Sequence, residues 1–164
     1  MRTVAEADDF ASRAHEGQVD KLGVPYVEHV RAVAAGLVPF GDDLVMAGLL
    51  HDVIEDTGWT AERLRAAGVP PQVVSVVEAV TNQDGVPYET KIRRITADRD
   101  ATLVKIADNA HNSRPDRTAG LPLDLRTRLA VKYRAARDLL WTAVDERDVE
   151  AIVAIVNPGL LNES

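Results

Sequence analysis

The segment from Leu49 to Asp56 constrains the fold most, because it places four ionisable side chains within an apolar run. Burying charged groups is unfavourable unless a partner or a cation compensates them. In a helix, His51 would lie one turn before Glu55, and Asp52 one turn before Asp56, so all four would share one broad sector. A neutral imidazole beside a carboxylate is half of a divalent-metal site. A buried ion pair or a capping cluster is the alternative interpretation.

The composition favours packed helices and excludes several kinds of site. Apolar residues make up 46% of the 164 residues and aromatic residues 4%, which suits helices better than a β-sandwich or barrel. The length predicts a single domain over residues 1–164. A net charge of −7 argues against nucleic acid as the partner. The chain has no cysteine, so a transition metal must rely on histidine and carboxylate ligands.

The start of the chain carries no targeting signal that we recognise. Its first nine residues include acids where a secretion signal would have an apolar core, and no apolar run approaches the length of a membrane span. We therefore expect a cytoplasmic protein that acts on a small molecule, without a membrane partner. The oligomeric state is not readable from the sequence.

Apolar spacing and helix-breaking residues predict an all-α bundle of about eight helices, some of them short. The valine-rich segment 71–80 could be a strand by composition, but no second strand candidate of similar strength exists to pair with it. Residues 113–123 are expected to form a loop, and the residues after 157 to fray. The expected helices cover residues 3–15, 26–37, 42–56, 60–67, 71–80, 88–97, 101–111, 124–144 and 146–155.

Histidines and acids from three of these helices would form a metal site if they converged. His29, His51, Asp52 and Asp108 would offer two nitrogen and two oxygen donors, which suit Mn²⁺, Fe²⁺ or Zn²⁺. Such a set leaves coordination positions open for water or substrate, as a metal-dependent hydrolase needs. Taken singly, His29 could lie on a helix surface and Asp108 at a helix end, and the spacing is not a closed local motif.

Five segments, in order along the chain, resemble one enzyme family. They are residues 14–18, 25–29, 49–57, 79–81 and 104–112. Together they resemble the HD superfamily of metal-dependent phosphohydrolases. The match is closer to the hydrolase domain of RelA/SpoT-type alarmone enzymes and to their small stand-alone hydrolases. The resemblance is strongest over residues 10–114 and weak in the helices of residues 124–155.

The resemblance implies a fold, a metal site and a reaction. It assigns one metal ion, usually Mn²⁺, to four ligands, His29, His51, Asp52 and Asp108. It implies that Glu55 and Asp56 position and deprotonate the attacking water, and that Asn112 lies near the nucleotide. The implied reaction removes the 3′-pyrophosphate of ppGpp or pppGpp and leaves GDP or GTP.

One position departs from the family pattern. The family usually has a basic residue, used against the nucleotide, where this chain has Asp20. Lys21 and Arg13 are candidates to replace it. Lys105, three residues before Asp108, either neutralises the site or extends along the apolar surface toward solvent.

Two other functions stay open at this point. One is a different nucleotide phosphohydrolase, such as an NADPH 2′-phosphatase or a nucleoside monophosphate phosphatase. The other is a non-catalytic regulator that binds a nucleotide. The complete set of acids and histidines argues against the regulator, because buried charges without a role are costly.

The remaining basic residues and histidines allow two interpretations each. Lys91, Arg93 and Arg94 form either a phosphate-facing patch or a solvated helix face. His15 and His111 are more often packing or supporting residues than metal ligands.

Overall fold

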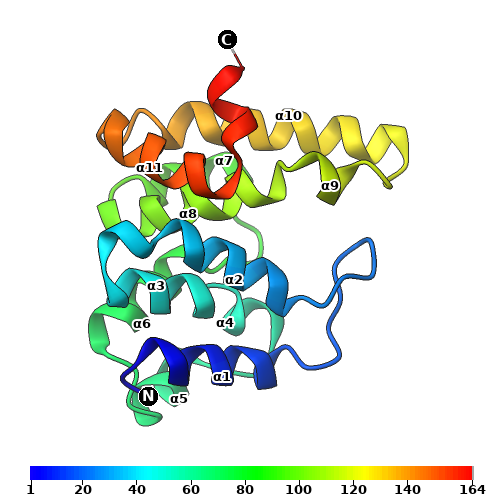
Figure 1. Ribbon diagram of the computed structural model, residues 1–164. Helices are drawn as coiled ribbons and strands as arrows, with labels where there is room; N and C mark the ends of the chain where they lie inside the picture. The colour runs from blue at the N-terminus through cyan, green and yellow to red at the C-terminus, as the bar shows by residue number, and fades with distance from the viewer. Residues whose placement is uncertain (164) are drawn as a thin grey trace.

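The computed structural model describes residues 1–163, which fold into helices joined by short connections (Figure 1). The all-α prediction is confirmed, and the only β feature in this range is an isolated bridge between Val19 and Pro25. No helix among these residues is both long and apolar enough to cross a bilayer. The helices of this range are α1 Val4–Ala14, α2 Val27–Gly36, η1 Val38–Phe40, α3 Asp42–Leu50, α4 Val53–Asp56, α5 Ala61–Ala66, α6 Pro71–Val80, α7 Tyr88–Ile95, α8 Arg99–Asn112, α9 Pro115–Thr118, α10 Leu123–Leu140, α11 Glu146–Val156 and η2 Pro158–Asn162.

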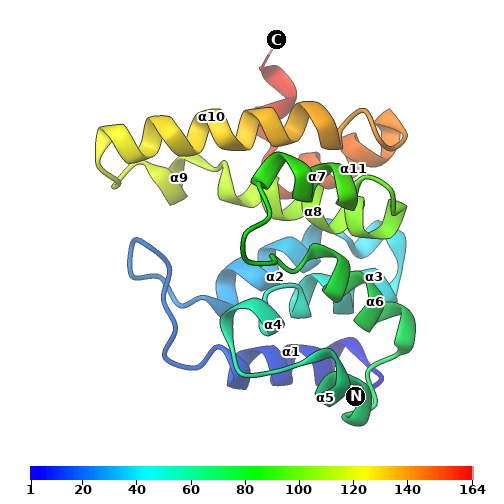
Figure 2. The same cartoon turned by 180° about the vertical axis from the view of Figure 1, so that it is seen from behind.

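The helices stack in tiers from the N-terminal end of the molecule to the C-terminal end. Helices α1 and α5 lie at the end that carries the N-terminus, α2, α3, α4 and α6 form the middle, and α8 to α11 form the other end (Figures 1 and 2). The long helix α10 crosses this far tier and packs on α7 and α8. The loop between α1 and α2 projects from the same side of the molecule as α9 (Figure 2).

A glycine allows α2 and α3 to approach closely. A Cβ atom on Gly48 would lie 3.0 Å from Ala34 Cα and 2.8 Å from a methyl carbon of Leu37, too close for any larger residue without a shift. Helix α2 also packs on α8 and α11, so it contacts helices from both the middle and the far tier. This arrangement brings the residues at one end of α2 and α3 next to α8.

The prediction of one continuous helix over residues 42–56 is wrong. Helix α3 ends at Leu50, and α4 begins at Val53. Asp52 has φ −101° and ψ 0°, in the sparsely populated bridge region, and this interrupts the helical path. The ring Nδ1 of His51 lies 2.7 Å from the carbonyl of Gly48 and satisfies a carbonyl left free at the helix end. The break turns both His51 and Asp52 toward α8.

Three further predictions have mixed outcomes. The valine-rich segment is the buried helix α6, as predicted. The predicted loop 113–123 contains the short helix α9, so this prediction is wrong in part. Residues 158–162 form a 3₁₀-helix rather than a frayed end because Leu160 is buried against the core. Ser164 lies outside the described residues.

Candidate metal centre

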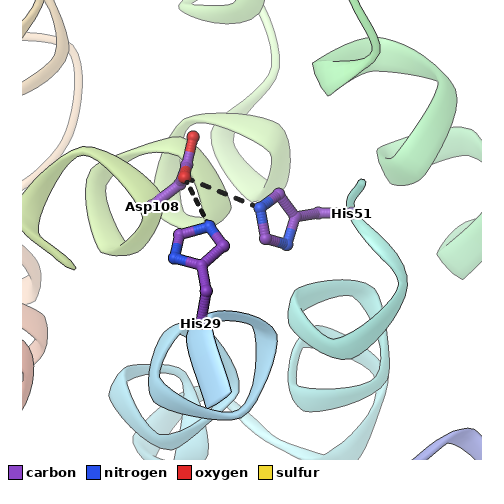
Figure 3. Close-up of side chains that lie close together, drawn as sticks. All are labelled: His29, His51 and Asp108. Carbon is purple, nitrogen blue, oxygen red and sulfur yellow. Dashed lines mark ion pairs between the residues drawn. The ribbon is translucent and has the colours of Figure 1, made fainter. Parts of the chain in front are cut away.

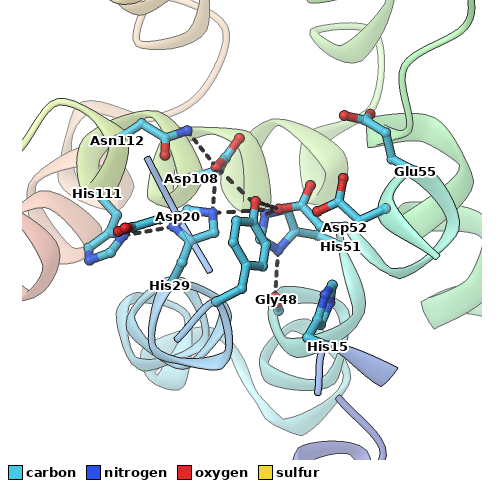
Figure 4. A network of polar contacts seen from close by, with 12 residues as sticks. His15, Asp20, His29, Gly48, His51, Asp52, Glu55, Asp108, His111 and Asn112 are labelled. Atoms are coloured by element: carbon cyan, nitrogen blue, oxygen red, sulfur yellow. Dashed lines mark hydrogen bonds and ion pairs between the residues drawn. The ribbon is translucent and has the colours of Figure 1, made fainter. Parts of the chain in front are cut away.

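His29, His51 and Asp108 converge in the interior, from α2, the turn after α3, and α8 (Figure 3). Asp52 lies beside them (Figure 4). Nε2 of His29 lies 3.1 Å from Oδ1 of Asp108 and 3.6 Å from Oδ2 of Asp52. Nε2 of His51 lies 2.9 Å from Oδ2 of Asp52 and 3.6 Å from Oδ1 of Asp108. Both imidazoles and the Asp108 carboxylate are buried, whereas the Asp52 side chain is 16% exposed, so protein encloses most of the cluster. The arrangement is a compact N₂O₂ donor set.

The break after α3 fixes the orientation of His51. Because a backbone carbonyl only accepts hydrogen bonds, Nδ1 of His51 must carry the proton in its contact with Gly48. A cation bound between the carboxylates would take the place of a second ring proton, and Nε2 would then face that cation with its lone pair. This atom is buried without a hydrogen-bond partner although it lies 2.9 Å from Asp52 Oδ2. A lone pair aimed at carboxylate oxygens is the state in which histidine binds a metal.

His29 has an outer partner of a different kind. Its Nδ1 lies 2.7 Å from Nδ1 of His111, and both rings are buried (Figure 4). Burial and the neighbouring His29 lower the pKa of His111 to about 3, so His111 is neutral at ordinary pH. A neutral His111 can accept the Nδ1 proton of His29, which leaves Nε2 of His29 free to bind a cation. The imidazole of His111 therefore supports His29 from behind.

Each carboxylate also has outer partners. The hydroxyl of Tyr26 donates to Asp52 Oδ2 at 2.7 Å. The ammonium of Lys105 donates to Asp108 Oδ2 at 2.7 Å. The amide of Asn112 donates to Asp108 Oδ1 at 2.9 Å (Figure 4). Such partners fix ligand orientation and are typical of metal sites.

The electrostatics of the cluster call for a cation. Burial alone would raise the pKa of Asp52 and Asp108, but His51 beside Asp52 and Lys105 beside Asp108 hold both values well below the usual range. Burial would lower the pKa of His51, and the charges of Asp52 and Asp108 outweigh it and raise the value. Positive charge is thus favoured between the two carboxylates, where a divalent ion would supply it. The donor set fits such an ion.

The two remaining acids of the central segment lie at the edge of the cluster. The Glu55 carboxylate accepts hydrogen bonds from the backbone N–H of Asn82 at 2.7 Å and from its side-chain amide at 3.1 Å. In Figure 4, Glu55 lies on the opposite side of Asp52 from His29. Asp56 instead accepts a hydrogen bond from the Gln18 amide at 3.0 Å. Burial, aided by the charge of Asp52, raises the pKa of Asp56.

A hollow of about 140 Å³ opens beside the cluster, and acids and lysines share its wall. Asp52, Glu55 and Asp108 contribute the acidic part. The basic part comes from three helices and is made of Lys91 on α7, Lys105 on α8 and Lys132 on α10. The volume is below the roughly 300–1,000 Å³ of a typical ligand pocket, so the hollow would enclose only part of a ligand of that size.

The lysines differ in how they are held. The Lys105 ammonium pairs with Asp108, and although burial lowers its pKa, the charge of Asp108 outweighs this and raises it. Lys132 is exposed, and its ammonium lies 4.3 Å from the centre of the Tyr88 ring. Lys91 is only 7% exposed, and burial together with the Lys105 charge lowers its pKa to about 8. One of the three ammonium groups therefore titrates near neutral pH.

The structure separates the basic residues that the sequence grouped on residues 88–97. Lys91 alone faces the hollow beside the metal cluster. The guanidinium of Arg93 pairs with Glu89 on the solvent face at 2.8 Å. Arg94 lines another hollow with Thr81 and Gln83, and Lys91 lines that hollow as well. Arg93 therefore lies on a solvated helix face, and a phosphate contact of Lys91 stays a prediction.

The other candidate substrate residues fall in two places. Asn112 lines the hollow at the metal cluster, and Lys21 lines a narrower hollow that also includes Asn112. Arg13 instead lines a hollow of about 520 Å³ beside Phe10 and Trp59, away from the cluster. Helix α1 thus places Arg13 apart from Lys21 and Asn112, at the end of the molecule that carries the N-terminus.

Several residues of the site were not identified from the sequence. Tyr26 lies three residues before His29, one helical turn away, and this spacing could have indicated it. Tyr88, Lys132 and Tyr133 also line the hollow, but they lie on polar helix faces with no motif around them.

Comparison with known proteins gives a consistent family signal. The family model described as HD domain matches residues 7–115. A guanosine-3′,5′-bis(diphosphate) 3′-pyrophosphohydrolase of Haemophilus influenzae is 37% identical over 134 residues, covering 74% of this chain and 19% of that protein. The bifunctional (p)ppGpp synthase/hydrolase SpoT of Escherichia coli K12 is 35% identical over 143 residues, covering 79% of this chain and 20% of that protein. The chain thus spans about a fifth of the length of these relatives.

A solved structure extends the similarity to nearly the whole fold. It is that of a metazoan ortholog of SpoT, described as hydrolysing ppGpp. The two structures align with a TM-score of 0.75 and 25% sequence identity, over 96% of this chain and 94% of the other. The similarity therefore includes α10 and α11, where the sequence resemblance is weak.

Proposed function

This chain belongs to the HD domain family, and on that premise we propose that it is a metal-dependent hydrolase that removes the 3′-pyrophosphate of ppGpp or pppGpp. The observation that carries the proposal is the buried convergence of His29, His51 and Asp108, with Asp52 beside them, next to a hollow lined with lysines. A buried donor set of this kind binds a divalent cation, and the lysines offer positive charge to a substrate with several phosphates. The names of the two bacterial relatives support the same substrate class.

We assign the metal to His29, His51, Asp52 and Asp108. Two imidazole nitrogens and two carboxylate oxygens suit Mn²⁺, with Fe²⁺ or Zn²⁺ as alternatives. When bound, the metal would lower the pKa of a water molecule and neutralise phosphate charge. The side chains behind the four ligands keep them oriented before and during turnover.

Glu55 is assigned the role of proton acceptor for the attacking water. Its carboxylate lines the hollow, and Asn82 holds it through two hydrogen bonds. Since a carboxylate has about four acceptor sites, two remain available for water. Asp56 does not line the hollow, and through Gln18 it connects to the loop after α1. We therefore assign the proton transfer to Glu55 and a supporting negative charge to Asp56.

The lysines are assigned to the phosphates. Lys105 lies closest to the metal cluster, because its ammonium touches Asp108. Lys91 and Lys132 lie on neighbouring helices of the same hollow and can bind phosphate oxygens further from the scissile bond. A substrate with pyrophosphates on two positions of the ribose could contact Lys105 with one pyrophosphate and Lys91 and Lys132 with the other. Asn112 and Lys21 then face the nucleoside.

The C-terminal helices support treating residues 1–164 as one functional unit. Helix α10 packs on α7 and α8 and supplies Lys132 and Tyr133 to the hollow. Removing it would take away one wall of the site. We therefore propose a single catalytic domain, rather than a core of residues 10–114 with a dispensable extension.

The proposal is tested by measuring phosphate and pyrophosphate release from ppGpp, pppGpp, NADPH, GTP and deoxynucleoside monophosphates. The protein is stripped of metal and assayed with and without Mn²⁺, Fe²⁺ or Zn²⁺. We expect pyrophosphate and GDP from ppGpp only when a metal is added. Release from another of these compounds alone would indicate that the protein is a different phosphohydrolase. No release from any member would favour a nucleotide-binding regulator.

A further inference from the structure

The hollow at the metal cluster adjoins a second, narrower one at the base of the loop between α1 and α2. Asn112 and Tyr133 line both hollows, and Asp20 and Arg117 line only the second. The second hollow measures about 30 Å³, room for one or two water molecules. A ligand that reaches it from the metal cluster would therefore place only an edge there.

The guanidinium of Arg117 is loosely held in this second hollow. One terminal nitrogen lies 3.4 Å from Asp20 Oδ2, and the other lies 3.4 Å from Asn112 Oδ1. Charge-assisted hydrogen bonds are normally about 2.7–2.9 Å long, so both contacts are weak. The side chain is 17% exposed, and each terminal nitrogen carries a second hydrogen. Arg117 is thus oriented but still has donors for a ligand.

Asp20 has a structural role that the sequence did not reveal. Its Oδ1 accepts hydrogen bonds from the backbone N–H groups of Leu22 at 2.8 Å and Val24 at 3.0 Å. Burial opposes ionisation of Asp20, but these two hydrogen bonds and the charge of Arg117 lower its pKa. Asp20 is therefore an ionised residue that shapes the loop with one oxygen and orients Arg117 with the other.

Arg117 is connected to the metal cluster through Asn112. Arg117 contacts Asn112, and Asn112 donates to Asp108 at 2.9 Å, so two polar contacts separate the guanidinium from a proposed metal ligand. A nucleotide with its scissile phosphate at the cluster would extend its nucleoside toward Arg117. The guanidinium would then meet the acceptor atoms of the base.

We propose that Arg117 binds the base of the substrate and selects guanine over adenine, with Asp20 as the residue that orients it. This inference rests on the proposed function for the nature of the ligand. Guanine presents two adjacent acceptors, O6 and N7, which match the two donors of a guanidinium, whereas adenine presents an amino donor in place of O6. Arg117 accordingly forms a bidentate contact with guanine that it cannot form with adenine.

The test measures equilibrium binding of GDP and ADP by isothermal titration calorimetry, which needs no turnover. The wild-type protein loaded with Mn²⁺ is expected to bind GDP at least about 5-fold more tightly than ADP. Arg117→Lys keeps the charge and loses the two-donor geometry, so GDP binding should fall to the ADP level while ADP binding stays unchanged. Arg117→Met should weaken both.

Two further variants separate a binding role from a structural one. Arg114→Met removes a neighbouring arginine that pairs with Asp116 outside the hollows, and it should leave both affinities unchanged. Asp20→Asn keeps an acceptor for the loop and loses the charge that orients Arg117, so it should weaken GDP binding less than Arg117→Met does. Equal loss of GDP and ADP binding in Arg117→Lys, or no loss, would overturn the proposal. A guanine preference in a protein that does not hydrolyse ppGpp would overturn the proposed function alone.

Discussion

The metal cluster differs from the basic residues around it, Lys132 and Arg117, in how firmly the side chains are held. At the cluster, the outer contacts of the ligands are 2.7–2.9 Å long, from Gly48 and His111 to the imidazoles and from Tyr26, Lys105 and Asn112 to the carboxylates. Further from the ligands, Lys132 on the wall of the hollow is exposed, and Arg117 in the adjoining narrower hollow makes only 3.4 Å contacts. The side chains of the cluster are therefore oriented before a ligand binds, whereas the basic side chains can change position to fit it.

This difference follows from what each side binds. A metal ion requires fixed distances and geometry, so misplaced ligands lose affinity steeply. A polyphosphate is a flexible anion, and lysines with rotatable stems can follow it without fixed geometry. We therefore expect substitutions at the cluster to abolish function and substitutions on the wall to tune it.

The largest effect is expected for Asp108→Ala. The variant loses a ligand and also leaves the Lys105 ammonium buried without its partner, which costs about 3–5 kcal/mol of stability. Metal retained after dialysis, measured by elemental analysis, should fall to background. The double variant Asp108→Ala/Lys105→Met should regain stability in denaturant unfolding but not metal. Metal retention in either variant would contradict the ligand assignment.

Glu55→Gln should separate catalysis from metal binding. Glutamine keeps an acceptor for Asn82 but cannot take a proton, so kcat should fall by about 10²–10⁴-fold with metal content unchanged. Asp56 lies outside the hollow, so kcat should fall less in the matched variant Asp56→Asn. Full activity in Glu55→Gln would remove Glu55 from the mechanism, and a larger loss in Asp56→Asn would exchange the two roles.

His111→Ala tests whether the outer contacts of the cluster matter. Loss of the ring behind His29 should lower metal affinity by about 10–100-fold, the usual cost of removing an outer partner. His15→Ala is the control, since His15 is also buried but contacts Gln18 rather than a ligand. Competition with a metal-binding dye measures both variants. Equal affinities would mean that His111 only fills space.

The same contrast explains what the sequence could predict. The four proposed ligands lie in segments with strong apolar spacing, and their residue types and the family resemblance made them candidates even with the helix wrongly drawn as continuous through His51 and Asp52. The break itself was not predictable, because it depends on tertiary contacts with α8 and on the side chain of His51 bonding to Gly48.

The roles of the basic residues around the cluster were harder to predict, for a physical reason. Lys132 and Arg117 lie on polar surfaces, where sequence patterns do not distinguish a solvated charge from a ligand-facing one. Asp20 was interpreted as a lost positive charge, whereas its carboxylate shapes the loop and orients Arg117. The contact of Asp20 with Arg117 joins residues 97 positions apart, and no local sequence pattern records it.

The smallest effect is expected from the titration of Lys91. With a pKa of about 8, lowered by burial and by Lys105, Lys91 is charged at pH 7 and neutral at pH 9 in the free enzyme. Since the anionic substrate binds the charged form, the KM for ppGpp should rise by roughly 10-fold as the pH rises through 8. Lys91→Arg keeps its charge over this range, so its KM should rise less. Lys91→Met should show the high KM already at pH 7, whereas equal pH profiles for all three proteins would show that Lys91 does not contact the phosphates.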